Sequence, residues 1–178
     1  EQAAIDHWAD AVIAAAPSAS DAFPRDAATD LLLRRAPRTR SGALAHSDAL
    51  AVDGVAVDDV GDIVRSVLDL DHSYLAVQGP PGTGKTYVGS HVIARLVAEK
   101  GFRVGVVAQS HAVVENMLER VVAAGLPGTQ VAKARKAGSA GDAPSFTAIA
   151  KDGYGAFAAE HPEGFVIGGT AWDLTHPG

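Results

Sequence analysis

Cysteine is absent from the 178 residues, which excludes disulfides, thiolate metal sites and catalysis by a thiol. The seven histidines form no HExxH motif or other close metal-ligand pair, so we expect them to be solvated. No apolar run reaches the ~18 residues of a membrane span, and the opening EQAAIDHWAD lacks the basic and apolar regions of a signal peptide. We therefore expect a cytoplasmic chain without a membrane partner.

Charged residues are also few, at 20% against 47% hydrophobic residues, which excludes a disordered or fibrous chain. The net charge of −6 gives no bulk attraction to a polyanion, so any contact with nucleic acid would depend on local groups. The length fits one main globular unit. Because the chain begins at Glu1 without a methionine and stops in DLTHPG, we expect it to be part of a longer protein.

Residues 1–58 are predicted to form an N-terminal helix and a connector. Apolar residues recur at helical spacing over residues 5–13, and the following text is poorly patterned. The connector contains LLLRRAPRTR at residues 31–40, with four arginines. Two explanations of these arginines remain open: a solvated or acid-paired loop, and a contact with a phosphate backbone.

Residues 59–178 alternate between helical and strand patterns. An alternation of this kind predicts an α/β fold with a parallel sheet. The predicted elements are a helix over residues 60–68, a short buried strand over 74–78, a helix over 88–97 closed by Gly101, a strand over 103–108, a helix over 113–122, a short strand near Val131, short helices near Thr147 and Phe157, and a strand over 165–170.

One stretch specifies a chemistry, because Gly79, Gly84, Lys85 and Thr86 match G-x-x-x-x-G-K-[ST] between a predicted strand and a predicted helix. The glycines let backbone N–H groups turn toward phosphate oxygens, and the helix dipole points at the same place. An ordinary Gly/Pro turn would need neither Lys85 nor Thr86, which we expect to contact the β- and γ-phosphates and Mg²⁺ respectively.

The motif thus predicts ATP and Mg²⁺ as cofactors, with Lys85 and Thr86 as catalytic residues and Thr86 as the metal ligand. The prolines stiffen the approach to the loop by fixing φ. The predicted nucleotide-binding residues are Gly79, Pro80, Pro81, Gly82, Thr83, Gly84, Lys85, Thr86 and Tyr87.

Two segments resemble superfamily 1 helicases of the nonsense-mediated-decay helicase branch. QGPPGTGKT at residues 78–86 is similar to the phosphate loop of that branch, and VVAQSHAVVENML at 106–118 resembles its motif Ia. The likeness covers about residues 59–178 and extends to bacterial proteins that fuse a RecB-like nuclease to this helicase. It implies a RecA-like P-loop NTPase sheet flanked by helices, here the N-terminal part of the first motor domain, with a possible nuclease domain in the parent chain.

The resemblance also implies a partner, a single strand of nucleic acid, with DNA favoured over RNA. The residues that it places beside the strand are Ser110, His111, Asn116 and Thr170. A helix N-cap is an equally good explanation of Ser110, and both roles are compatible. Trp172 follows in FVIGGTAWDL, where it could stack on a base, although packing in the core is the more common use of tryptophan.

Several parts of a motor are missing from the sequence. No Asp-Glu pair follows an apolar strand after the loop, so the Walker B carboxylates lie outside the chain, and Asp58 and Asp59 stand near the position of the adenine-reading glutamine. We expect an ATP-binding part of an ATP-dependent helicase or translocase that hydrolyses little ATP alone. Two alternatives remain: an AAA+ or kinase-type P-loop ATPase, and a non-enzymatic nucleotide-gated module that binds a strand.

Overall fold

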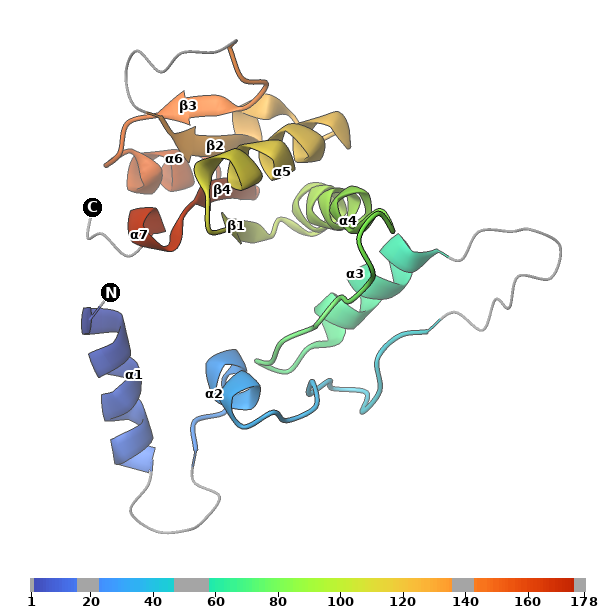
Figure 1. The fold of residues 1–178 in the computed structure, drawn as a ribbon, viewed down its shortest axis with the longest axis vertical. Helices are drawn as coiled ribbons and strands as arrows, with labels where there is room; N and C mark the ends of the chain where they lie inside the picture. Colours follow the sequence, from blue (N-terminus) through green and yellow to red (C-terminus); the bar gives the residue numbers. More distant parts are fainter. Residues whose placement is uncertain (1, 16–22, 47–57, 136–142, 175–178) are drawn as a thin grey trace, which may run out of the picture. The chain divides into compact units, whose positions relative to one another are not determined.

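The computed structural model describes residues 2–15, 23–46, 58–135 and 143–174. Its contacts divide the chain into two compact units, Glu1–Pro80 and Pro81–Gly178. Figure 1 shows the elements of both units in chain order. Within the described ranges, no helix combines the length and the apolar character needed to cross a membrane.

Among the described residues of the first unit, the helices are α1 (Gln2–Ala15), α2 (Ala27–Leu32) and α3 (Asp59–Asp69), and both helices predicted here are confirmed. The side chain of Asp26 accepts a hydrogen bond from the Thr29 N–H at the start of α2. Asp58 caps α3 in the same way, accepting from the Gly61 N–H at 2.9 Å. Aspartate suits this position because its oxygen satisfies an N–H that the helix cannot. The structure thus gives Asp58 a capping role.

The arginine-rich segment is tied to the turn that precedes the phosphate loop. Asp30 is fully buried and forms an ion pair with Arg38. The other carboxylate oxygen of Asp30 accepts from the Ser73 hydroxyl at 2.7 Å, and the Ser73 hydroxyl accepts from the Arg38 N–H at 3.1 Å. Arg40 donates to the carbonyl of Leu68 at 2.9 Å. The acid-paired explanation is therefore confirmed for Arg38.

The buried strand predicted over residues 74–78 is wrong. The segment has no regular secondary structure, and Val77 is 52% exposed. Its first residue is held within the first unit, since the Tyr74 hydroxyl donates to the Arg35 carbonyl at 2.7 Å. A strand requires a neighbour to pair its backbone groups, and none of the described strands pairs with this segment. Apolar composition alone carries no information about such a neighbour.

The second unit is built on a four-stranded parallel sheet in the order β1-β4-β2-β3, which confirms the predicted α/β class. The predicted helix near Thr147 is wrong, because this segment is a strand that pairs with residues 132–134. Three residues are too few to distinguish a helical from a strand period. The strands are β1 (Arg103–Val107), β2 (Val131–Ala134), β3 (Thr147–Ile149) and β4 (Phe165–Gly169).

Helices cover both faces of this sheet (Figure 1). Adjacent residues of β4 reach opposite faces, so Val166 packs with α4 and α5 and Phe165 packs with α6. Helix α5 lies so close to β4 that a side chain would not fit at Gly168. A Cβ there would come within 2.6 Å of Val114 and 2.7 Å of Leu118. The helices are α4 (Lys85–Lys100), α5 (His111–Ala123), α6 (Tyr154–Glu160) and α7 (Ala171–Leu174), with a 3₁₀ turn at Gly128–Gln130.

The remaining predicted elements of this unit are confirmed. Helix α4 ends at Lys100 and is followed by Gly101 at φ +65°, the left-handed conformation expected of a helix-terminating glycine. Strands β1, β2 and β4, and helices α5 and α6, occupy the segments predicted for them. The sheet and its two helical layers position two loops at the starts of α4 and α5.

Candidate functional site

The part of the phosphate loop within the second unit, residues 81–86, has the backbone of an anion cradle. Gly82 and Gly84 have φ of +85° and +76°, where L side chains are strained. Gly84 is the N-cap of α4, and its lack of a side chain deprives the helix of the cap that serine or aspartate would provide. Lys85 is exposed and Thr86 is partly buried. The positive end of the helix is thus directed at an open, glycine-shaped loop.

Tyr87, also predicted to contact nucleotide, lies in the first turn of α4. Its ring is 58% exposed and packs at 4.1 Å, centroid to centroid, against His91. The Tyr87 carbonyl accepts from the Ser90 hydroxyl at 2.8 Å and lies 2.8 Å from the His91 Nδ1. The ring is therefore supported from its own helix and presented beside the loop.

The second loop leads from β1 into α5. Ser110 is extended, at φ −137° and ψ 148°, and its hydroxyl accepts from the Val113 N–H at 3.4 Å. The predicted N-cap is confirmed. His111 at the start of the helix is exposed. Asn116 lies further along the same helix, where its side-chain oxygen accepts from Arg120 at 3.3 Å.

Thr170, at the end of β4, begins a variant of the capping box in which its hydroxyl donates to the carboxylate and does not accept from the backbone. Its backbone N–H and its hydroxyl both donate to the Asp173 carboxylate at 2.8 Å, and the Asp173 N–H donates to the Thr170 carbonyl at 3.0 Å. The His111 Nδ1 lies 3.6 Å from the same carboxylate. The structure therefore brings His111 and Thr170 together at Asp173, whereas Asn116 contacts its own helix.

Asp173 was not among the residues singled out from the sequence. Partial burial favours its protonated form, but the two hydrogen bonds from Thr170 and the charges of His111 and Lys133 outweigh this effect and hold the pKa below its ordinary value. The carboxylate is thus kept ionised at neutral pH. A signal was available, since T-A-W-D at residues 170–173 has the spacing of a capping box.

A partly buried polar cluster lies where β2 and β4 separate. Their pairing ends at Lys133 and Gly168, and the Tyr154 hydroxyl accepts from the Ala134 N–H at 3.2 Å and donates to the Gly168 carbonyl at 3.0 Å. Burial, with the charge of Asp173 adding to it, raises the pKa of Tyr154, so the hydroxyl keeps its proton. The Lys133 amine, on a residue only 3% exposed, lies 3.1 Å from Glu115. No sequence motif indicated this cluster, because it depends on which strands become neighbours.

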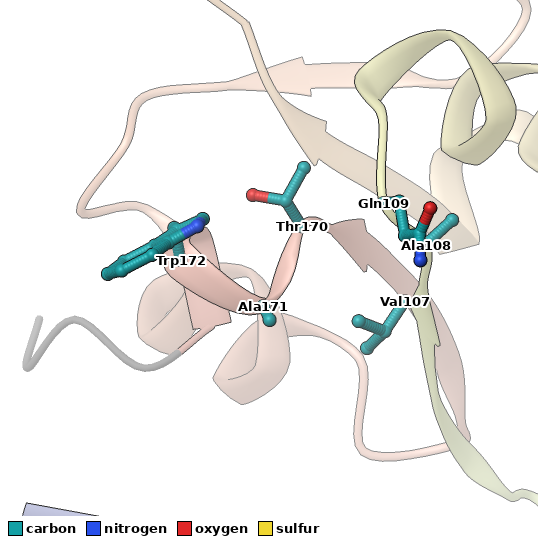
Figure 2. A pocket seen from close by; sticks show the side chains of 6 residues that line it. All are labelled: Val107, Ala108, Gln109, Thr170, Ala171 and Trp172. Atoms are coloured by element: carbon teal, nitrogen blue, oxygen red, sulfur yellow. The ribbon is translucent and has the colours of Figure 1, made fainter. Parts of the chain in front are cut away.

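A pocket of about 450 Å³ lies at the carboxyl ends of β1 and β4, and we call it the strand-end pocket. Figure 2 shows its residues arriving from the two strand ends. Trp172 is 71% exposed and Val107 is 56% exposed, so the expectation that Trp172 packs in the core is wrong. In α7, Asp173 and Leu174 lie against Gly169 of β4, whereas Trp172 lies on the exposed side of the helix. The lining residues are Val107, Ala108, Gln109, Thr170, Ala171 and Trp172.

A parallel sheet flanked by helices, with a glycine-shaped loop that ends in Lys-Thr at a helix start, defines a P-loop NTPase-like domain. A family model described as an AAA domain matches residues 58–141, which include the loop and all of α4, β1 and α5. The chain therefore contains a helicase-like P-loop domain. Among curated proteins and among solved structures, nothing matches the chain.

Proposed function

We propose that the chain is the ATP-binding part of the first motor domain of an ATP-dependent helicase or translocase that acts on a single strand. The observation that carries the proposal is the start of α4, where glycine at φ +76° is followed by Lys85 and Thr86. This geometry suits a phosphate group, since backbone N–H groups and the helix dipole favour an anion there. The AAA-domain match over residues 58–141 supports the same assignment.

The residues present fit Mg-ATP. The exposed Lys85 would hold the β- and γ-phosphates, and the Thr86 hydroxyl would bind Mg²⁺, which when bound supplies neutralisation of phosphate charge. Gly82 and Gly84 have no side chain, so the backbone can approach phosphate oxygens directly. A Cβ at either position would meet nothing within 4 Å, but the positive φ would strain any L residue placed there. Tyr87, exposed beside the loop, would lie against the nucleotide.

The nucleic-acid strand would lie across the carboxyl ends of β1 and β4. Ser110 and His111 stand at the start of α5, where backbone N–H groups can receive a phosphate. Thr170 is 8% exposed, and its hydroxyl is engaged with Asp173. We therefore assign it the positioning of α7 rather than a direct strand contact, and Asn116 remains a predicted contact further along α5.

Hydrolysis needs more than this chain contains. A carboxylate must orient the attacking water, and positive charge must stabilise the transition state; loss of an arginine finger alone costs about 10³- to 10⁵-fold in rate. We therefore expect the chain alone to bind ATP and to hydrolyse it slowly, while the parent protein hydrolyses ATP in response to a strand. A nuclease domain in that parent stays a prediction.

The test is calorimetric titration of the parent protein with Mg-ATP, with and without single-stranded DNA. In a motor, each ligand changes the affinity for the other by the same factor. Coupling of the two affinities, together with strand-stimulated ATP hydrolysis, is the expected result. ATP binding that is indifferent to the strand would reject the motor, and phosphate transfer to a small substrate would favour a kinase instead.

A further inference from the structure

We propose that Trp172 is a stacking platform for one unpaired base of the bound strand, seated in the strand-end pocket. The inference rests on the proposed function, because it specifies how the strand is held. It goes further by assigning affinity to a base rather than to the phosphate backbone. The platform is the indole of Trp172 on α7, and Val107 at the end of β1 lines the same pocket (Figure 2).

The side chains of Trp172 and Val107 are both exposed. Three phenylalanines of the same unit, Phe146, Phe157 and Phe165, are only 4 to 5% exposed, whereas Tyr87, which we assign to the nucleotide, is 58% exposed. Trp172 is 71% exposed and Val107 is 56% exposed, and both line one pocket. Large apolar side chains that are exposed together beside a pocket mark a binding surface more often than a defect of packing.

Hydrogen bonds on both sides of Trp172 hold the backbone that carries its indole. Trp172 lies between the two residues of the capping box, with Thr170 before it and Asp173 after it. The Leu174 N–H also donates to the Thr170 carbonyl, at 3.2 Å. This short helix is therefore fastened to the end of β4, and a ring held in advance loses less freedom when it binds a ligand.

The occupant that suits this pocket is a base and not a phosphate group. The net charge of −6 gives no bulk attraction to a polyanion, and the Asp173 carboxylate near the pocket adds a further negative charge. Stacking of a neutral base on an indole does not depend on bulk charge, because the base offers a flat face to the ring. Gln109, on the opposite wall, has both a donor and an acceptor for a base edge.

The same geometry selects a single strand over a duplex. The bases of a duplex are already stacked on one another, whereas an unpaired base is free to stack on an aromatic side chain. Backbone N–H groups at the start of α5, beside exposed His111, offer a place for the adjoining phosphate. Stacking of this kind tolerates any base, as a motor that moves along a strand requires.

The experiment uses the intrinsic fluorescence of Trp172. The chain has two tryptophans, so Trp8→Phe leaves Trp172 as the sole indole fluorophore. This variant is titrated with oligothymidine and with an abasic strand of the same length, while the anisotropy of a labelled strand reports binding independently. We expect oligothymidine to quench Trp172 and the abasic strand to leave its emission unchanged.

Substitution then measures the contribution of the platform. Trp172→Ala should weaken oligothymidine binding about tenfold, the order expected for loss of one stacked base, with an unchanged slope of affinity against salt. Trp172→Phe should restore most of the affinity because it keeps an aromatic face. Leu32→Ala, which truncates a side chain 67% exposed in the first unit, is the matched control and should leave binding unaltered.

The outcomes separate this inference from the proposed function. Equal binding of oligothymidine by Trp172→Ala and the unsubstituted chain overturns the platform and leaves the strand-binding motor standing. Equal quenching by the abasic strand, or an indole that acrylamide cannot reach in the free chain, overturns the platform as well. Absence of any strand binding in the anisotropy measurement overturns both proposals.

Discussion

Helices α4 and α5 begin in opposite ways, although they pack side by side on one face of the sheet. Helix α4 starts from Gly84, a left-handed residue without a side chain, whereas α5 starts from Ser110, whose hydroxyl accepts from the Val113 N–H. The second helix therefore satisfies one of its own N–H groups with the side chain of its N-cap residue, and the first has no such side-chain cap. We expect substitutions at α4 to affect ligand binding most, and those at α5 to affect stability.

The largest effect should come from Lys85→Ala, which removes the one side-chain cation of the phosphate-loop motif. Without it, only backbone dipoles and Mg²⁺ would offset the charge of the triphosphate. We expect the parent protein to lose strand-stimulated ATP hydrolysis and the chain to lose Mg-ATP binding in calorimetry.

Lys100→Ala is the matched control for this substitution, because it removes the same charge from the opposite end of the same helix. Its only expected cost is the favourable interaction of Lys100 with the helix dipole, about 0.3–1 kcal/mol of stability, with nucleotide affinity unchanged. Turnover by Lys85→Ala equal to that of the control would refute the assignment of the loop.

The next effect should come from Gly84→Ala, which forces a Cβ into a backbone at φ +76°. A Cβ there meets nothing within 4 Å, so the cost is conformational, about 1–2 kcal/mol, and not steric. We expect lower stability in urea unfolding and weaker Mg-ATP binding.

Gly105→Ala, on β1, provides the comparison for Gly84. Its added Cβ also meets open space, but its φ lies outside the left-handed range. This substitution should be neutral or should stabilise by about 0.4–1 kcal/mol through the unfolded chain. If both alanine variants behave alike, the left-handed geometry of the loop has no importance.

The sequence predicted the elements whose patterns are long and local. Helices α4 and α5 each carry several turns of apolar spacing, and the loop before α4 carries a motif in which each position has a chemical reason. Ser110 was recognisable because an N-cap is a local feature. These predictions needed no knowledge of distant parts of the chain.

The failures share a dependence on neighbours. Residues 74–78 are apolar enough for a strand but lack a pairing strand among the described residues. Trp172 is exposed because Asp173 and Leu174, not Trp172, are the α7 side chains that lie against Gly169 of β4. The Tyr154 hydroxyl bridges the Ala134 N–H and the Gly168 carbonyl only because β2 pairs with β4, which lies well after it in the chain. The order of the strands along the sequence does not predict that β2 and β4 are neighbours in the sheet.

A smaller effect should come from Ser110→Ala, which removes the cap of α5. The hydrogen bond to the Val113 N–H is long, at 3.4 Å, so we expect a loss near the low end of the usual range, about 0.5–1 kcal/mol in urea unfolding. Ser110→Asn keeps a capping oxygen and should retain the stability. Equal stability of the two variants would mean that the hydroxyl does not cap the helix.

The smallest effect concerns Asp173, whose pKa in the folded chain lies below its ordinary value of about 3.8. A lowered pKa means that the folded state stabilises the ionised form of Asp173, so this contribution to stability is present above about pH 4 and is lost as the pH falls through the folded pKa.

In the Trp8→Phe chain, Trp172 emission should therefore change at acid pH as the capping box loosens. Asp173→Asn should remove this transition, because its amide does not titrate in that range, whereas Asp152→Asn, at an exposed acid in the turn before α6, should leave it intact. A transition that persists unaltered in Asp173→Asn would show that a group other than Asp173 controls the position of α7.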